Sequence, residues 1–153
     1  MNSLEKQMVE ILTKCKDHGA VSVKAEFEAE GTRVDELLRL LDVIRAAGLP
    51  LTVKIGGCEA IRDLLEAKQF GVRYVVAPMV ETAYAGSKYV DAKNLVFTKQ
   101  EQEETDFLFN LETIAGFDNR IELVKATAHE NGADGVVFGR VDFVGSQGKP
   151  RDA

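Results

Sequence analysis

One recurring unit constrains the fold of this chain more than any other feature of its sequence. A helical pattern ends at a glycine, and a short apolar run follows at once. The unit occurs at Gly19 before residues 21–27, at Gly48 before 51–55, at Gly71 before 72–77 and at Gly132 before 135–141. Glycine is typical of the position after a helix, where the backbone turns left-handed, and we expect this conformation at all four. With the run at residues 107–111, which lacks the glycine, the pattern predicts five strands.

The segments between these runs carry apolar residues at the three- and four-residue spacing of amphipathic helices. The predicted helices cover residues 3–17, 33–47, 58–70 and 118–131, with a weaker one over 83–93 and a helix end or loop over 99–105. Strands that alternate with helices in this way are joined by right-handed crossovers and form a parallel sheet. We therefore expect one α/β domain over residues 1–153, either a (β/α)8 barrel or a doubly wound open sheet.

Composition and charge exclude several classes of function. The chain of 153 residues is 45% hydrophobic and 29% charged, which is typical of a globular protein, and its net charge of −6 disfavours nucleic acid. It contains no apolar run long enough to span a membrane, and the charged first 20 residues do not resemble a secretory signal. Its two cysteines, Cys15 and Cys58, are too few for a disulfide framework, so we expect a cytoplasmic protein.

Alternation within the predicted strands separates an apolar face from a face that becomes charged toward the carboxyl ends. The charged face comprises Lys24, Glu26 and Glu28 on the first strand, Lys54 on the second, Glu112 on the fourth, and Arg140 and Asp142 on the fifth. The same alternation assigns Val136 and Phe138 to this face. Both faces of a parallel sheet are buried, so the lysines, Glu26 and Arg140 should form ion pairs in a barrel interior. The alternative is that these are loop-edge charges in water.

Two of these carboxylates suggest a metal site. Glu112 and Asp142 are predicted to end consecutive strands, which lie about 4.8 Å apart in a parallel sheet, so they can share one cation. Oxygen ligands without histidine or cysteine suit Mg²⁺ or Mn²⁺. Such a site leaves room for a chelating 2-oxo acid, and the cation would act as a Lewis acid on the enolate that forms when a C–C bond breaks. Lys54 can hold the substrate carboxylate, or alternatively form a Schiff base.

Three segments resemble a known family. Val76-Ala77-Pro78-Met79-Val80-Glu81-Thr82, Asn110-Leu111-Glu112-Thr113 and the run from Gly139 to Gly148 are similar to strand ends of the HpcH/HpaI aldolase and citrate lyase β-subunit superfamily. The resemblance implies a metal-dependent (β/α)8 barrel of C–C lyases that act on 2-oxo or hydroxy acids. It places the metal ligands at Glu112 and Asp142. It places substrate binding at Gly139, Arg140, Val141 and Ser146.

The chain also departs from the family pattern, which indicates a distinct subgroup. Lys54 stands where the family usually has arginine, and Arg140 where the aldolases often have proline. Glu26 and Glu28 occupy the segment that often carries a histidine or aspartate pair for acid–base work, so both are candidate catalytic residues. A full barrel needs about 250 residues. We therefore expect a fragment or short form with five βα units, whose open sheet edges favour a homo-oligomer.

Three functions are compatible with these patterns. The first is a divalent-metal-dependent C–C lyase acting on a 2-oxo or hydroxy acid. The second is a non-catalytic barrel remnant that binds a small organic acid or a partner protein. The third, an open sheet that binds a nucleotide, is disfavoured because no glycine-rich phosphate loop follows the first strands.

Overall fold

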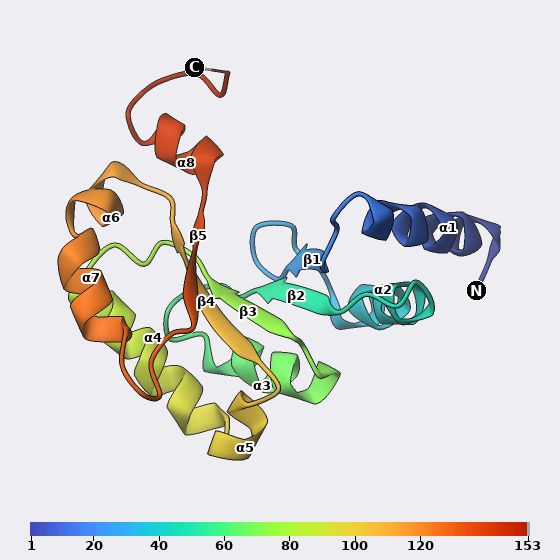
Figure 1. Cartoon of the computed structure of the whole chain (residues 1–153), viewed down its shortest axis with the longest axis horizontal. Coiled ribbons are helices and arrows are strands. Elements are labelled where there is room, and N and C mark those ends of the chain that lie inside the picture. The colour runs from blue at the N-terminus through green and yellow to red at the C-terminus, as the bar shows by residue number, and fades with distance from the viewer. Residues whose placement is uncertain (153) are drawn as a thin grey trace.

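The computed structural model describes residues 1–152 and contains one sheet of five parallel strands (Figure 1). The strands are β1 (Val23–Glu26), β2 (Leu51–Lys54), β3 (Tyr74–Ala77), β4 (Asp106–Leu111) and β5 (Gly135–Phe138). They pair in sequence order, from β1 to β5. A doubly wound sheet reverses its strand order at a switch point, whereas a barrel adds strands in order. The five predicted strands are therefore confirmed, and they form five consecutive units of a (β/α)8-type barrel.

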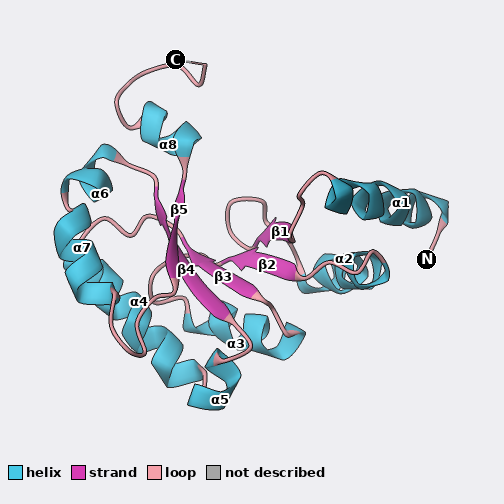
Figure 2. Cartoon of the chain, in the orientation of Figure 1, coloured by secondary structure: helices cyan, strands magenta, loops and turns pink. Residues whose placement is uncertain are grey.

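The helices are α1 (Ser3–Asp17), α2 (Val34–Ala46), α3 (Ile61–Phe70), α4 (Ala83–Val96), α5 (Lys99–Gln102), α6 (Ile114–Asp118), α7 (Arg120–Thr127) and α8 (Arg140–Gly145). Those from α2 to α7 connect the strands on the outer side of the sheet, whereas α1 precedes β1 and α8 lies beyond the end of β5 (Figure 2). The helix predicted over residues 118–131 is shorter than expected, because α7 ends at Thr127. Over residues 1–152, no helix is both long and apolar enough to cross a membrane.

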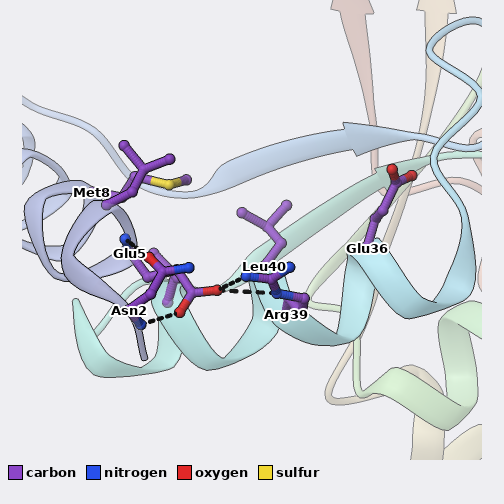
Figure 3. A pocket seen from close by; sticks show the side chains of 8 residues that line it. Asn2, Glu5, Met8, Glu36, Arg39 and Leu40 are labelled. Carbon is purple, nitrogen blue, oxygen red and sulfur yellow. Dashed lines mark hydrogen bonds and ion pairs between the residues drawn. The ribbon is translucent and has the colours of Figure 1, made fainter.

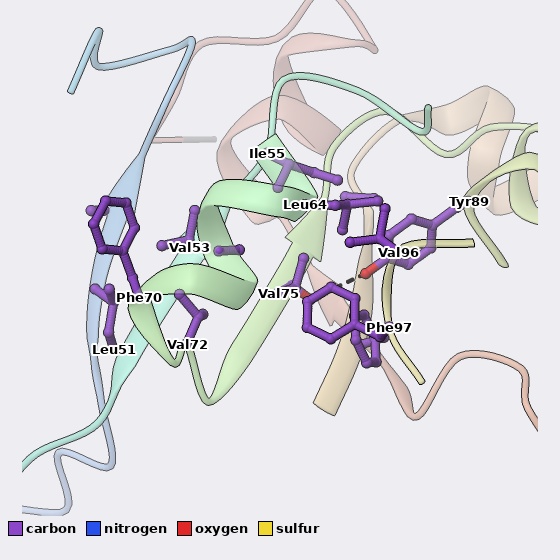
Figure 4. Packing of buried hydrophobic residues seen from close by; sticks show 14 of the residues in the cluster. Leu51, Val53, Ile55, Leu64, Phe70, Val72, Val75, Tyr89, Val96 and Phe97 are labelled. Atoms are coloured by element: carbon purple, nitrogen blue, oxygen red, sulfur yellow. Dashed lines mark hydrogen bonds between the residues drawn. The ribbon is translucent and has the colours of Figure 1, made fainter. Parts of the chain in front are cut away.

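The core lies between the outer face of the sheet and the helices, as the apolar alternation predicts. Val53, Val75 and Phe107 of the sheet are fully buried, as is Leu64 of α3. Figure 4 shows Val53, Val75 and Leu64 in one apolar cluster with Tyr89 of α4 at its side. The hydroxyl of Tyr89 donates to the carbonyl of Val75 at 3.3 Å. Burial and this hydrogen bond together fix α4 against β3.

One lysine is buried within this layer. The exposed fraction of Lys93 on α4 is 2%, and its ammonium donates to Gln102 Oε1 at 2.7 Å. It also lies 4.9 Å from the centre of the Phe107 ring. Burial lowers the pKa of Lys93, and the negative charge of Asp134 offsets only part of this effect.

The helix ends agree with the glycine pattern at three of the four predicted positions. Gly19, Gly48 and Gly71 have φ of 90°, 68° and 66°. At the fourth position the prediction is wrong, because Asn131 carries the positive φ of 109° and Gly132 does not. Gly132 is needed for space instead: a Cβ there would lie 1.9 Å from the carbonyl oxygen of Thr127.

The end of the fifth unit also differs from the prediction. β5 ends at Phe138, so Arg140, Val141 and Asp142 lie in α8 and not in a strand. The two faces of β5 are the reverse of those predicted. Val137 pairs with Asn110 and lies with it on the inner face, whereas Val136 lies beside Leu123 of α7. Val136, Val137 and Phe138 are all apolar, so alternation alone does not assign this strand.

The contact between α4 and α7 generates a prediction about stability. A Cβ on Gly86 of α4 would lie 2.7 Å from Cγ2 of Thr127 and 3.4 Å from Leu123. Gly86→Ala should therefore lower the free energy of unfolding, because overpacking costs about 1–3 kcal/mol against a gain in helix propensity of at most about 1 kcal/mol. Urea unfolding measures the difference.

Two further variants make this prediction specific. Gly145→Ala in α8 is the matched control, since nothing lies within 4 Å of a Cβ at that position, and it should not destabilise the protein. Thr127→Ser removes the clashing methyl group and keeps the hydroxyl that donates to Leu123 O. Combined with Gly86→Ala in a double variant, it should therefore restore much of the lost free energy of unfolding. An unchanged stability of Gly86→Ala would contradict the packing described here.

Candidate active site

The inner face of the sheet borders a hollow of about 280 Å³ to which every strand contributes. Its lining includes Lys24 of β1, Thr52 of β2, Val76 of β3, Asn110 of β4 and Val137 of β5. In barrels the loops at the carboxyl ends of the strands carry the chemistry. The polar groups on the inner face at the carboxyl ends of the strands are therefore the candidates for an active site.

A larger hollow of about 500 Å³ lies elsewhere, between α1 and α2 (Figure 3). Apolar side chains such as Met8 and Leu40 line it, and Arg39 of α2 pairs with Glu5 of α1 across it. The hydrogen bonds from the Asn2 backbone and from Arg39 lower the pKa of Glu5. Because α1 and α2 alone form this hollow, it contains none of the strand-end groups.

Glu112 is the most enclosed acid of the candidate site. It follows β4 directly, and its exposed fraction is 3%. The backbone N–H of Met79 donates to its Oε1 at 2.8 Å, and the side-chain amide of Asn110 donates to its Oε2 at 2.8 Å. Met79 has a φ of 52°, which is uncommon for a residue with a side chain. The carboxylate is thus fixed between the ends of β3 and β4.

Gly139 brings the end of β5 against this carboxylate. A Cβ at Gly139 would lie 2.6 Å from Cβ of Glu112 and 3.0 Å from its Oε2, so only glycine fits here without displacement. Gly139 also precedes α8, and Asp142 lies in the first turn of that helix, exposed to solvent. The structure therefore brings Gly139 to Glu112, and Asp142 follows three residues later.

The other residues predicted from this segment have structural contacts. Ser146 accepts from the Ile114 N–H at 2.9 Å and donates to Phe143 O at 2.7 Å, which ties α8 to α6. Val141 is exposed. Arg140 donates to Arg151 O and forms no ion pair within residues 1–152, so its predicted place in the interior charge network is wrong. Its position outside the strand explains the difference.

The predicted ion pairs of Lys24, Glu26 and Lys54 are confirmed. Glu26 lies opposite Lys54 in the register of β1 and β2, and Lys24 precedes it by two residues on the same face. Lys54 Nζ lies 2.9 Å from one oxygen of Glu26, and Lys24 Nζ lies 2.5 Å from the other. Burial raises the pKa of Glu26, but the hydrogen bonds from both lysines outweigh it and lower the pKa overall. Glu26 is therefore charged at neutral pH.

Glu28 lies apart from this network. Its side chain stands over Gly56, where a Cβ would approach it to 2.5 Å. Asp63 accepts the N–H of Gly56 at 2.6 Å, and burial together with the charges of Glu28 and Glu66 raises the pKa of Asp63. Within residues 1–152 the Glu28 side chain has no hydrogen-bonding partner, so its carboxylate is accessible at the carboxyl end of the sheet.

Sequence reasoning missed three residues that shape the site. Asn110 holds Glu112, and its position two residues earlier, hence on the same face of the strand, was the signal for it. Glu81 accepts from the Thr113 hydroxyl at 2.6 Å, and its carbonyl accepts from Asn119, so it locks the loop after β3 to the loop after β4. Met79 acts through its backbone, for which the sequence carries no signal.

The oxygen atoms at the site suit a hard divalent cation, but the protein supplies only a few of the ligands that such a cation needs. In the part of the chain that the structure describes, no three His, Cys, Asp or Glu residues are grouped to hold a metal ion. The hydrogen bonds to Glu112 use one lone pair on each oxygen and leave the others available. A site based on Glu112 would thus leave several positions for water or a ligand.

Comparison with solved structures shows where this fold recurs. A crystal structure of the citrate synthase SbnG is 18% identical, with a TM-score of 0.74 over 93% of this chain and 61% of that one. The HpcH/HpaI aldolase from Desulfitobacterium hafniense DCB-2 is 15% identical, with a TM-score of 0.73 over 95% of this chain and 63% of that one. An HpcH/HpaI aldolase/citrate lyase family protein from Burkholderia cenocepacia J2315 is 14% identical, with a TM-score of 0.70 over 98% of this chain and 73% of that one.

These likenesses show the fold, and the chain spans less than two thirds of the length of the first two structures. No curated protein matches the sequence significantly. The sequence profile of HpcH/HpaI aldolase/citrate lyase matches residues 17–153, which is most of the chain and includes all the segments that suggested the resemblance. The chain therefore belongs to the HpcH/HpaI aldolase/citrate lyase family.

Proposed function

We propose that this protein is a divalent-metal-dependent C–C lyase acting on a 2-oxo or hydroxy acid. The observation that carries the proposal is the buried carboxylate of Glu112, held by Met79 and Asn110 from two strand ends. Burying a charge without a cation is costly, even when two hydrogen bonds reach it. A cation at Glu112 would offset that cost, and family membership supports chemistry of this class.

Glu112 and Asp142 are the residues proposed to hold Mg²⁺ or Mn²⁺. Both offer the oxygen ligands that these cations prefer. The contact of Gly139 with Glu112 supports the pairing, because Asp142 follows within one helical turn of that contact. When bound, the cation would supply a Lewis acid that polarises the keto oxygen of the acid.

The remaining roles fall to residues on the inner face and at the strand ends. Lys54 supplies an ammonium group for the substrate carboxylate, with Gly139 and Val141 offering backbone contacts. C–C cleavage leaves the bonding electron pair on the keto-bearing fragment, and a proton must leave the hydroxyl of the other fragment. Glu28, which has no lysine partner, suits this proton transfer better than Glu26, whose pKa is lowered by two lysines.

Two observations favour the second candidate, a non-catalytic binder of organic acids. Lys54 is engaged by Glu26 at 2.9 Å, and Asp142 is exposed on a short helix. Binding of an acid would survive such an arrangement even where turnover did not. We also propose that the chain forms a homo-oligomer. Val136 and Phe138 on the edge strand β5 are exposed, and such an apolar edge favours pairing with another chain.

Metal binding tests the central claim on the chain itself. Mn²⁺ should bind the wild-type protein, and Glu112→Gln should weaken binding at least about tenfold, because a charged ligand becomes a neutral one. Asp142→Asn should also weaken it. Electron paramagnetic resonance of free Mn²⁺ gives the affinities, with the exposed Glu103→Gln as the control. Equal affinity in wild type and Glu112→Gln would refute the site.

Deuterium exchange into the methyl group of pyruvate tests the chemistry. With Mn²⁺ present, Glu112→Gln should slow the exchange about 10²-fold, since electrostatic stabilisation of developing charge is commonly of that size. Exchange that persists in EDTA and in the variant would exclude the metal-dependent route. It would favour Lys54 as a Schiff-base nucleophile, which borohydride trapping detects. Mn²⁺ binding without any exchange would favour the binding protein.

A further inference from the structure

β5 has the residues of an interior strand but the position of an edge strand. Among residues 1–152 its only partner strand is β4, so its second edge is open. Val136, Val137 and Phe138 are exposed, whereas three of the four residues of the interior strand β3 are buried. Edge strands are commonly protected by charged side chains or proline, and β5 contains neither. A strand that is apolar on both faces is typical of the middle of a parallel sheet.

The exposed apolar surface continues from β5 onto α7. Val136 and Val124 of α7 line one hollow of about 30 Å³, and both are about half exposed. Ile121, one helical turn before Val124, is also exposed. The side of α7 that carries Thr127 is already used, since Thr127 lies beside Gly86 of α4. We call the exposed surface the β5 face, and it consists of Ile121, Val124, Val136 and Phe138.

α1 is the opposite case, an amphipathic helix whose apolar stripe is largely uncovered. Within the described chain, none of its 15 residues is buried, whereas α2 buries four. α1 packs against α2, and Leu4 and Met8 line the hollow between the two helices. Leu4 and Ile11 are 63% and 60% exposed. The strand that follows α1 is β1, whose second edge is also open. We call this surface the β1 face, and it consists of Leu4, Met8, Ile11, Val21 and the open edge of β1.

The two faces complement each other in geometry. All five strands run parallel, so β5 of one copy can lie beside β1 of another in the orientation that neighbouring strands of the sheet already share. In barrels of this type the helices form a layer outside the strands. Because α1 leads into β1, its stripe of Leu4 and Ile11 would meet Val136 and Phe138 of the incoming β5. Each face thus provides what the other lacks: a strand for α1 to cover, and a neighbouring strand with a covering helix for β5.

The charges of the two faces permit contact between copies of an acidic chain. The net charge of the chain is −6, so two copies repel each other on average. α1 contains three lysines and three acidic residues, and β1 contains one of each, so the β1 face is neutral. β5 is uncharged, and α7 has a net charge of +1 from Arg120, Lys125 and Glu122. Contact between these two faces therefore adds no like-charge repulsion of its own.

We propose that this chain associates head to tail, with β5 of one copy adding to the open edge of β1 in a second copy, beneath α1 of that copy. Two different surfaces of each molecule form such an interface, which makes it heterologous. The inference rests on the homo-oligomer proposed above and names its interface, and it is independent of the metal site. It differs from a symmetrical contact, in which two β5 faces or two β1 faces would meet.

One charge substitution on each face tests the interface. Val136→Glu alters the β5 face and Ile11→Glu alters the β1 face, and circular dichroism verifies the fold of both variants. Analytical ultracentrifugation over a concentration series should show that the wild-type chain associates. Each variant should raise the dissociation constant at least about tenfold, because an unpaired charge enters an apolar contact. Leu95→Glu is the matched control, since Leu95 of α4 is exposed outside both faces, and it should associate as the wild type does.

A mixture of the two variants distinguishes head-to-tail from symmetrical pairing. Equal amounts of Val136→Glu and Ile11→Glu supply one intact face of each kind, on different molecules. The mixture should therefore form mixed dimers at concentrations at which each variant alone is monomeric. Native mass spectrometry with one variant isotope-labelled identifies these dimers. Symmetrical pairing predicts no such recovery.

The outcomes separate this inference from the rest of the proposed function. A wild-type chain that stays monomeric would overturn the interface and the homo-oligomer together. Association that survives both substitutions would refute the interface but leave the homo-oligomer standing. Loss of association in one variant alone, or a mixture that stays monomeric, would overturn the head-to-tail arrangement. Mn²⁺ binding is measured separately, so its failure would refute the metal site alone.

Discussion

Parallel pairing of the five strands in sequence order is the constraint on which the rest of the structure depends. Parallel neighbours need a crossover on one side of the sheet, so the helices gather outside and the apolar residues of the strands face them. The carboxyl ends of all strands then lie at one edge. Glu112, Gly139 and the loop at Met79, distant in sequence, meet there because of this geometry and not because of any local motif.

The inner face separates its charges instead of neutralising them in place. The lysine-rich group lies on β1 and β2, and the buried acid lies beyond β3. The two groups are held differently. Glu26 is fixed by cations, which lower its pKa, whereas Glu112 is fixed by neutral amides that orient it without cancelling its charge. Glu26 is thus suited to hold cationic side chains in place, and Glu112 is suited to attract a cation.

Much of the fold follows from the sequence because two independent signals agree. Glycines end the first three helices, and apolar runs with polar neighbours give the strands and, for β1, β2 and β4, their faces. The prediction failed at β5, where three successive apolar residues remove the alternation and Gly139 ends the strand before Arg140. At the site, Glu112 and the pairing of Glu26 with Lys54 were predictable. The role of Met79 was not, because a backbone N–H in a left-handed turn leaves no mark in the side-chain pattern.

The close approach of Gly139 to Glu112 has a consequence for how this chain can diverge. A side chain at position 139 would overlap the β-carbon of Glu112, so the glycine cannot change while the longer acid remains. Shortening the acid first would open the space, but it would also withdraw the oxygens from Met79 and Asn110. The two positions are therefore expected to change together or not at all across descendants of this sequence.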